Sequence, residues 1–140
     1  MRNELKLVGV QLLDEEHQVV LDLINNLIDL ISRVADSDCR PLVRIGLEKI
    51  ESCITAHFKQ EEDILASVNH PDLEMHRSIH RTICETVIAV RDRFDRWPTY
   101  SGAKELSHAL RNTWVSHVNS VDTAYADYLA TGPKTLRSTR

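Results

Sequence analysis

The sequence has few of the residues that interrupt helices or build aromatic cores. Its 140 residues include four glycines, four prolines, two tryptophans, three tyrosines and two phenylalanines. So little glycine and proline favours long helices joined by short connections, and the core must be mostly aliphatic. No apolar run approaches the roughly 18 residues that a membrane-spanning helix needs. The length suits one domain. These features predict a single all-α domain without a membrane partner.

The sequence also lacks an excess of positive charge and a cysteine framework. The net charge of −4 gives no reason to expect nucleic acid or an anionic membrane as a partner. Three cysteines without a C-x-x-C pair are typical of a reducing compartment. The first residues lack the apolar stretch of a signal peptide. We therefore expect a cytoplasmic protein, and we expect it to be a monomer.

Apolar residues recur at helical spacing in four segments. They predict helices over residues 14–35, 41–68, 72–96 and 101–130, with Asp14 and Ser101 as N-caps and Pro41 at a first helical position. The predicted fold is an up-down-up-down antiparallel four-helix bundle. Residues 14–130 form its domain, and residues 131–140 form a short basic tail. Residues 1–13 form an extended arm whose apolar side chains cover a hydrophobic seam: Leu7, Val8, Val10, Leu12 and Leu13.

Histidines and carboxylates recur at inward-facing positions of these helices. His57 and Glu61 are four residues apart, and so are His76 and His80. Residues at this spacing lie one turn apart on the same helix face, so each pair can hold a metal ion. His17 lies on the inner stripe of the first helix, and it therefore points toward the same interior.

The last pair, His117 and Asp122, is five residues apart. Five residues turn about 140° and rise about 7.5 Å along a helix. Both side chains can therefore reach one centre only with divergent rotamers or with a local loosening of the helix.

A structural role has to be weighed against the metal site. A single histidine is more often a surface or hydrogen-bonded core residue than a ligand, and a salt bridge could also compensate a buried Glu61. The complete set favours metal, because five imidazoles and two carboxylates exceed one ion and suit a pair of octahedral metals such as iron. Manganese in one position is an alternative, since the ligands suit several divalent metals.

Ligand number predicts an asymmetric site. If both carboxylates and a solvent-derived oxo or hydroxo group bridge the two metals, the metal with three histidines is saturated. The metal with two histidines is then five-coordinate and has one open position for a small diatomic ligand.

This pattern resembles the hemerythrin signature, and most closely that of the single-domain bacterial members. The resemblance covers roughly residues 8 to 130 and includes the flanking residues Asp14-Glu15-Glu16-His17, His57-Phe58, Glu61-Glu62 and Pro71. It implies a non-haem di-iron centre, bridged by oxo or hydroxo, that binds O2 reversibly at the five-coordinate iron. It further implies that His76, His80 and His117 hold the saturated iron, that His17 and His57 hold the other, and that Glu61 and Asp122 bridge them.

One departure from the family concerns the ligand pocket, for which we predict the lining residues Val20, Phe58, Thr113, Trp114 and Val118. Family members commonly have a Trp-Leu pair four and three residues before the histidine of the fourth helix, where this chain has Thr113 and Trp114. An inward Trp114 would crowd the open position or donate its N–H to a bound ligand. An outward Trp114 would leave Thr113 to admit water.

The first hypothesis for function is reversible O2 binding for transport, storage or sensing. The alternative is a di-iron oxidoreductase acting on peroxide, nitric oxide or Fe(II). A sensor whose arm signals to a separate partner, and a metal-free interaction bundle, are further hypotheses. Cys53 and Cys84 are either small core residues or thiols that react with peroxide. His70 and His108 are predicted to lie outside the ligand set.

Overall fold

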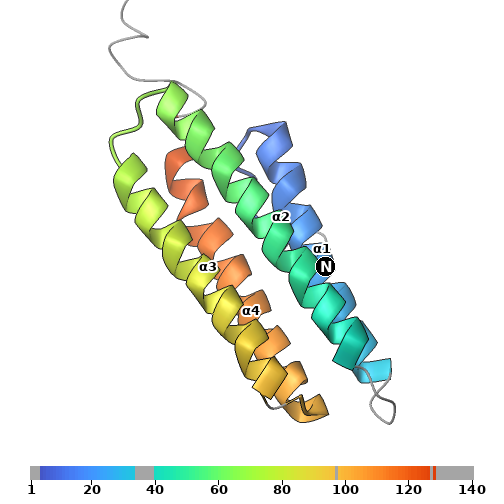
Figure 1. Ribbon diagram of the computed structural model, residues 1–140. Coiled ribbons are helices and arrows are strands. Elements are labelled where there is room, and N and C mark those ends of the chain that lie inside the picture. The colour runs from blue at the N-terminus through green and yellow to red at the C-terminus, as the bar shows by residue number, and fades with distance from the viewer. Residues whose placement is uncertain (1–3, 34–39, 97, 127, 129–140) are drawn as a thin grey trace, which may run out of the picture.

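The computed structural model describes residues 4–33, 40–96, 98–126 and 128. They form helices α1 (Gln11–Arg33), α2 (Arg40–Ser67), α3 (Leu73–Arg96) and α4 (Tyr100–Ser120), followed by a short 3-10 helix, η1 (Asp122–Tyr125). Successive helices run in opposite directions; α1 packs against α2 and α4, and α2 against α3 (Figure 1). The predicted up-down-up-down four-helix bundle is confirmed. None of the described helices is both long and apolar enough to cross a membrane.

The inward faces of the helices build two groups of buried apolar side chains. The larger group fills most of the bundle, and the smaller comprises Val8, Leu13, Leu65 and Tyr125. The polar inward residues lie between them: α1, for example, passes from Leu13 through His17 to Val20. The inward stripe of this helix is buried at Leu13, His17, Val20, Leu21, Ile24, Leu27 and Ile31, and it is half-buried at Ile28. A polar layer is thus enclosed by apolar packing on both sides.

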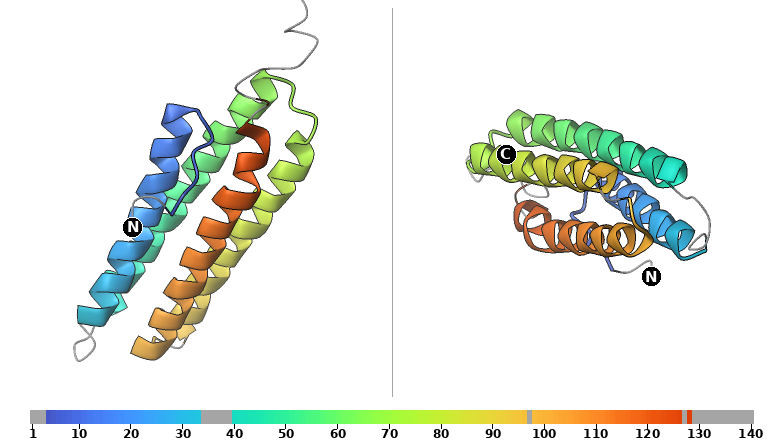
Figure 2. Two further views of the ribbon diagram at one scale, coloured as in Figure 1. Left: turned by 180° about the vertical axis from the view of Figure 1, so that it is seen from behind. Right: turned by 60° about the horizontal axis from the view of Figure 1, so that its bottom comes forward.

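The N-terminal arm, described from residue 4 to residue 10, runs back along the bundle between α1 and α4 (Figure 2). Val8 is buried as predicted, and so is Leu5, which the prediction missed. The prediction was wrong for Leu7 and Leu12, which are 76% and 44% exposed. α1 begins at Gln11, so Asp14 is not its N-cap.

The fourth helix differs from the prediction at both ends. Its N-cap is Thr99, whose hydroxyl accepts the backbone N–H of Gly102 at 3.0 Å, rather than Ser101. α4 ends at Ser120, and the chain turns at Val121 into η1 instead of continuing as one helix. The predicted tail, residues 131–140, lies outside the described residues.

Candidate metal centre

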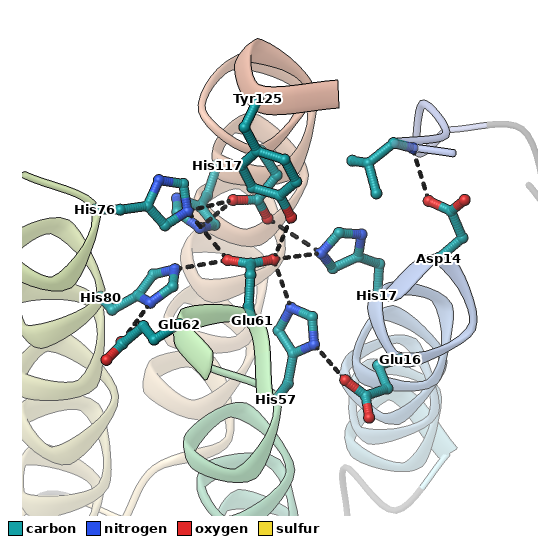
Figure 3. A network of polar contacts seen from close by, with 12 residues as sticks. Asp14, Glu16, His17, His57, Glu61, Glu62, His76, His80, His117 and Tyr125 are labelled. Atoms are coloured by element: carbon teal, nitrogen blue, oxygen red, sulfur yellow. Dashed lines mark hydrogen bonds and ion pairs between the residues drawn. The ribbon is translucent and has the colours of Figure 1, made fainter. Parts of the chain in front are cut away.

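Seven buried polar side chains meet between the two apolar groups, with every helix contributing (Figure 3). α1 supplies one histidine, α2 a histidine and a glutamate, α3 two histidines and α4 one histidine, and η1 supplies an aspartate. The structure thereby brings together all of the predicted ligands: His17, His57, Glu61, His76, His80, His117 and Asp122. They form two groups that share Glu61 and Asp122, one with His76, His80 and His117 and the other with His17 and His57; within each group, one N or O atom per residue lies within 4.8 Å of the others.

Glu61 turns its two oxygens toward different histidines. Oε1 lies 2.9 Å from Nε2 of His80 and 3.1 Å from Nε2 of His76. Oε2 lies 3.2 Å from Nε2 of His57 and 3.3 Å from Nε2 of His17. One carboxylate therefore faces two separate groups of imidazoles.

Asp122 divides the histidines in the same way. Its Oδ1 lies 3.1 Å from Nε2 of both His76 and His117, and its Oδ2 lies 3.1 Å from Nε2 of His17. The centre thus has two parts that share both carboxylates. We call them the three-histidine half (His76, His80 and His117) and the two-histidine half (His17 and His57).

The break at Val121 explains how His117 and Asp122 reach one centre. A regular helix would separate their directions by about 140°. Here Val121 N–H still donates to the carbonyl of His117 at 2.8 Å, but the following residues adopt the tighter 3-10 form. The regular α-helix is therefore interrupted between the two residues, but by a tightening rather than by the predicted loosening, and Asp122 points inward.

Two carboxylates outside the predicted set orient the imidazoles. Glu16 accepts from Nδ1 of His57 and Glu62 accepts from Nδ1 of His80, each at 2.7 Å. A histidine that donates from Nδ1 keeps a lone pair on Nε2, which is the nitrogen that faces the centre. The only sequence signal was the position of each glutamate beside a ligand; which imidazole it would contact depends on how the helices are rotated.

We expect Glu16→Gln and Glu62→Gln each to weaken metal binding by about 10- to 100-fold, because the orienting carboxylate and its effect on imidazole basicity are lost. Glu15→Gln is the control, since Glu15 is exposed and its side chain accepts from that of Gln11. Competition against a chelator measures the affinity. Equal affinities for all three variants would contradict an orienting role.

Tyr125 is a further residue outside the predicted ligand set that contacts the centre. Its hydroxyl donates to Oε2 of Glu61 at 2.6 Å, on the side of the two-histidine half. Burial, together with the nearby Glu61 and Asp122, raises the pKa of Tyr125 far above its ordinary value. The phenol therefore remains a hydrogen-bond donor throughout the ordinary pH range.

Without metal, protons hold the cluster together. Burial disfavours a charged imidazole, but hydrogen bonds to Asp122 and Glu61 outweigh it and raise the pKa of His17 to about 9. The same balance raises the pKa of His76 to about 9. Burial also opposes the charge on Glu61, yet hydrogen bonds from four histidines hold its pKa well below the usual value. A cation would replace these protons.

We expect the metal-free protein to lose stability as the pH rises from about 6.5 to about 9. Both His17 and His76 bind a proton more tightly when folded, so their contribution is complete below the unfolded pKa and is lost as pH passes through about 9. Denaturant unfolding of chelator-treated protein across this range tests the expectation. Equal stability at about pH 6.5 and about pH 9 would contradict it.

The predicted pocket residues Val20, Phe58, Trp114 and Val118 are buried, and Thr113 is half-buried. The ring of Phe58 stacks on the imidazole of His80, with 3.7 Å between the ring centroids. The indole of Trp114 lies 5.7 Å from the ring of His57 and 6.0 Å from that of His17. Trp114 is therefore a wall of the two-histidine half.

The orientation of Trp114 decides between the earlier alternatives. An outward indole is wrong, because the residue is only 1% exposed. Donation to a bound ligand is also wrong, because the indole N–H donates to the main-chain carbonyl of His17 at 3.1 Å. The Trp114 side chain therefore points inward and restricts the space beside the two-histidine half.

The other singled-out residues lie outside the cluster. His108 is exposed. His70 accepts the backbone N–H of Asp72 with Nδ1 at 3.1 Å and packs on Tyr128, so it lies outside the ligand set, as predicted. Cys53 and Cys84 are half-buried free thiols.

The residues present fit a pair of metal ions. Nε2 of His57, His80 and His117 is buried and lacks a hydrogen-bond partner among the described residues, although a carboxylate oxygen is near each. Their lone pairs converge with two shared carboxylates, an N/O donor set that suits octahedral divalent metals. Fold and site together define a class: four-helix bundles with a buried histidine–carboxylate metal centre.

The chain belongs to the hemerythrin family, because residues 8–129 match the family model described as the hemerythrin HHE cation binding domain. The chain is 25% identical over 121 residues to bacteriohemerythrin of Stenotrophomonas maltophilia (strain R551-3), which covers 86% of this chain and 74% of that protein. It is 28% identical over 114 residues to myohemerythrin of Theromyzon tessulatum, which covers 81% and 79% respectively.

The fold of this chain is also similar to that of a solved hemerythrin structure. A crystal structure of wild-type hemerythrin matches this chain with a TM-score of 0.71 at 22% identity, covering 86% of this chain and 89% of that one. The resemblance found in the sequence is confirmed.

Proposed function

We propose that this chain is a non-haem di-iron protein that binds O2 reversibly at a five-coordinate iron. The observation that supports this most strongly is the division of the carboxylate oxygens between three histidines and two. In this proposal, His76, His80 and His117 would hold one iron, His17 and His57 would hold the other, and Glu61 and Asp122 would bridge the pair together with an oxo or hydroxo group. When bound, the two irons supply the electrons for reversible O2 binding.

The protein surrounds the two-histidine half with side chains that limit its space and exclude water. Trp114 covers both of its imidazoles, and Val20 and Val118 are buried in the same apolar group. Apolar walls exclude the water that would otherwise compete for the open position and promote oxidation of the irons. Tyr125 adds a hydroxyl donor at Glu61 Oε2, which fixes the bridge on this half.

Two features favour binding over the alternative of a di-iron oxidoreductase acting on peroxide, nitric oxide or Fe(II). The donor set is richer in imidazole than in carboxylate, which is less suited to stabilising highly oxidised iron. Burial also raises the pKa of the Cys84 thiol, the one nearest to His80 in sequence, so it is a weak nucleophile toward peroxide. The cytoplasmic location and the monomeric state remain predictions.

Metal stoichiometry is the first test. We expect two iron ions per chain after anaerobic loading with Fe(II), measured by elemental analysis of protein freed of excess metal. Loading in mixtures of Fe(II) and Mn(II) tests the manganese alternative, because the donor set alone does not exclude it. A stoichiometry of one metal per chain, or none, would refute the di-iron proposal.

A further inference from the structure

The two-histidine half has an unsatisfied donor position. Nδ1 of His17 is buried and has no partner within the part of the chain that the structure describes. Its neighbour in the site, His57, uses Nδ1 to bind Glu16. A metal-bound imidazole almost always donates its second N–H to a carboxylate, a carbonyl or water. In Figure 3 the second nitrogen of His17 lies on the side of the ring away from the centre, toward Asp14.

Asp14 is the carboxylate on that side, and the arm occupies it. Oδ1 accepts the backbone N–H of Val8 at 2.7 Å and Oδ2 accepts that of Gly9 at 3.2 Å. Asp14 precedes His17 by three residues on α1, and residues at this spacing are neighbours on a helix surface. Both line a pocket of about 540 Å³ between the arm and α1. Asp14 and His17 therefore border the same space beside the arm.

We propose that Asp14 is shared between the arm and His17, so that the arm and the two-histidine half control one another. With the arm in place, its amides hold the carboxylate and His17 lacks an acceptor. With the segment around Gly9 lifted, the carboxylate accepts the Nδ1–H of His17 and makes that imidazole a stronger donor to its metal. The inference rests on the proposed function, because binding of metal at Nε2 puts the proton on Nδ1.

The coupling is reciprocal by thermodynamic linkage. Any change at the centre that makes the Nδ1–H of His17 more acidic strengthens its competition for Asp14 and weakens the arm. Any partner that lifts the arm changes the donor strength of His17.

The remaining contacts limit the movement to the segment near Gly9. The start of the arm is tied to α4: Lys6 N–H donates to Oδ1 of Asn119 at 2.8 Å, and the side chain of Asn119 donates to the carbonyl of Glu4 at 2.8 Å. Gly9 has a φ of 91°, in the left-handed region that disfavours other residues. The segment before α1 therefore depends on this glycine, on Asp14 and on burial of the Val8 side chain in the smaller apolar group.

Two variants lift this segment with opposite consequences for His17. Gly9→Ala introduces backbone strain where a Cβ meets nothing within 4 Å, and it leaves Asp14 intact. Asp14→Ala removes the acceptor itself. We expect hydrogen exchange at the amides of Val8 and Gly9, or of the alanine that replaces Gly9, to become about tenfold faster in both. Glu15→Ala, the matched control, should leave exchange unchanged.

The discriminating readout is proton NMR of the iron-loaded protein. In Gly9→Ala the exchangeable Nδ1–H of His17 should move downfield and exchange more slowly, with a more negative midpoint potential. In Asp14→Ala neither change should occur. Identical His17 signals and potentials in both variants would overturn the proposal and leave Asp14 only an anchor for the arm, as would unchanged amide exchange in Asp14→Ala.

Two further results keep the test decisive. If Gly9→Ala leaves amide exchange unchanged, Val8→Pro, which removes the donor to Oδ1, takes its place with the same two outcomes. If the wild-type chain takes up no iron, the proposed function fails. A wild-type chain that holds two irons, with His17 signals that do not separate the variants, refutes only the sharing of Asp14.

Discussion

Replacing Glu61 with glutamine is expected to abolish binding of both metal ions. Glu61 is fully buried, and its two oxygens face different halves of the centre, so one substitution removes a ligand from each ion. An amide is a weak ligand and carries no charge to balance the cations. The loss of affinity should exceed the roughly 100-fold that outer carboxylates contribute. Elemental analysis and chelator competition measure it.

The helices should still form in this variant. Removing one partner of a buried charged network costs about 3–5 kcal/mol, which lies within the stability of an ordinary domain of about 5–15 kcal/mol. Circular dichroism and denaturant unfolding of the metal-free forms separate loss of metal from loss of fold. Glu85→Gln on the exposed face of α3 is the control. A folded Glu61→Gln that retains two irons at wild-type affinity would disprove the bridging role.

Replacing Trp114 with leucine is expected to speed oxidation of the O2-bound protein at least about tenfold, a barrier reduction of about 1.4 kcal/mol. The indole covers both imidazoles of the two-histidine half, and its N–H holds the main-chain carbonyl of His17. A smaller side chain leaves a cavity beside the open position and admits water. The decay of the O2-dependent absorption measures the rate.

Two controls separate the effect of the Trp114 side chain on the open position from a general loss of stability. Leu110→Ala removes a buried side chain one turn earlier on α4, at a cost of about 2–5 kcal/mol, without opening the site. Trp114→Phe keeps a ring but removes the N–H. We expect Leu110→Ala to oxidise at the wild-type rate and Trp114→Phe at an intermediate one. Faster oxidation in Leu110→Ala equal to that in Trp114→Leu would indicate loosened packing instead.

The sequence predicted the gathering of the seven polar residues because helix periodicity alone turns them inward. His57 and Glu61 share a face at any helix orientation, and apolar neighbours such as Ile54 and Leu65 identify that face as buried. A departure from the regular α-helix between His117 and Asp122 also followed from their spacing, although it is a 3-10 tightening and not a loosening. Local geometry was sufficient for these conclusions.

Sequence periodicity does not predict which residues of different elements contact one another. Glu16 precedes one candidate ligand but binds the imidazole of another, His57, on a different helix. Asp14 is a residue type that is common at N-caps. Helix α1 nevertheless begins before it, and its carboxylate accepts hydrogen bonds from backbone N–H groups of the arm. The direction of the Trp114 N–H likewise depends on the carbonyl that α1 presents. Each of these depends on how neighbouring elements are rotated and shifted.

Reversible O2 binding at the two-histidine half is the central claim, and one optical experiment tests it most directly. The iron-loaded, reduced protein is recorded without O2, with O2, and after O2 has been removed. The proposed function predicts a visible charge-transfer band that appears with O2 and disappears on its removal, with the reduced spectrum restored. Direct and irreversible conversion to the oxidised iron spectrum, with no band that depends on O2, would contradict it.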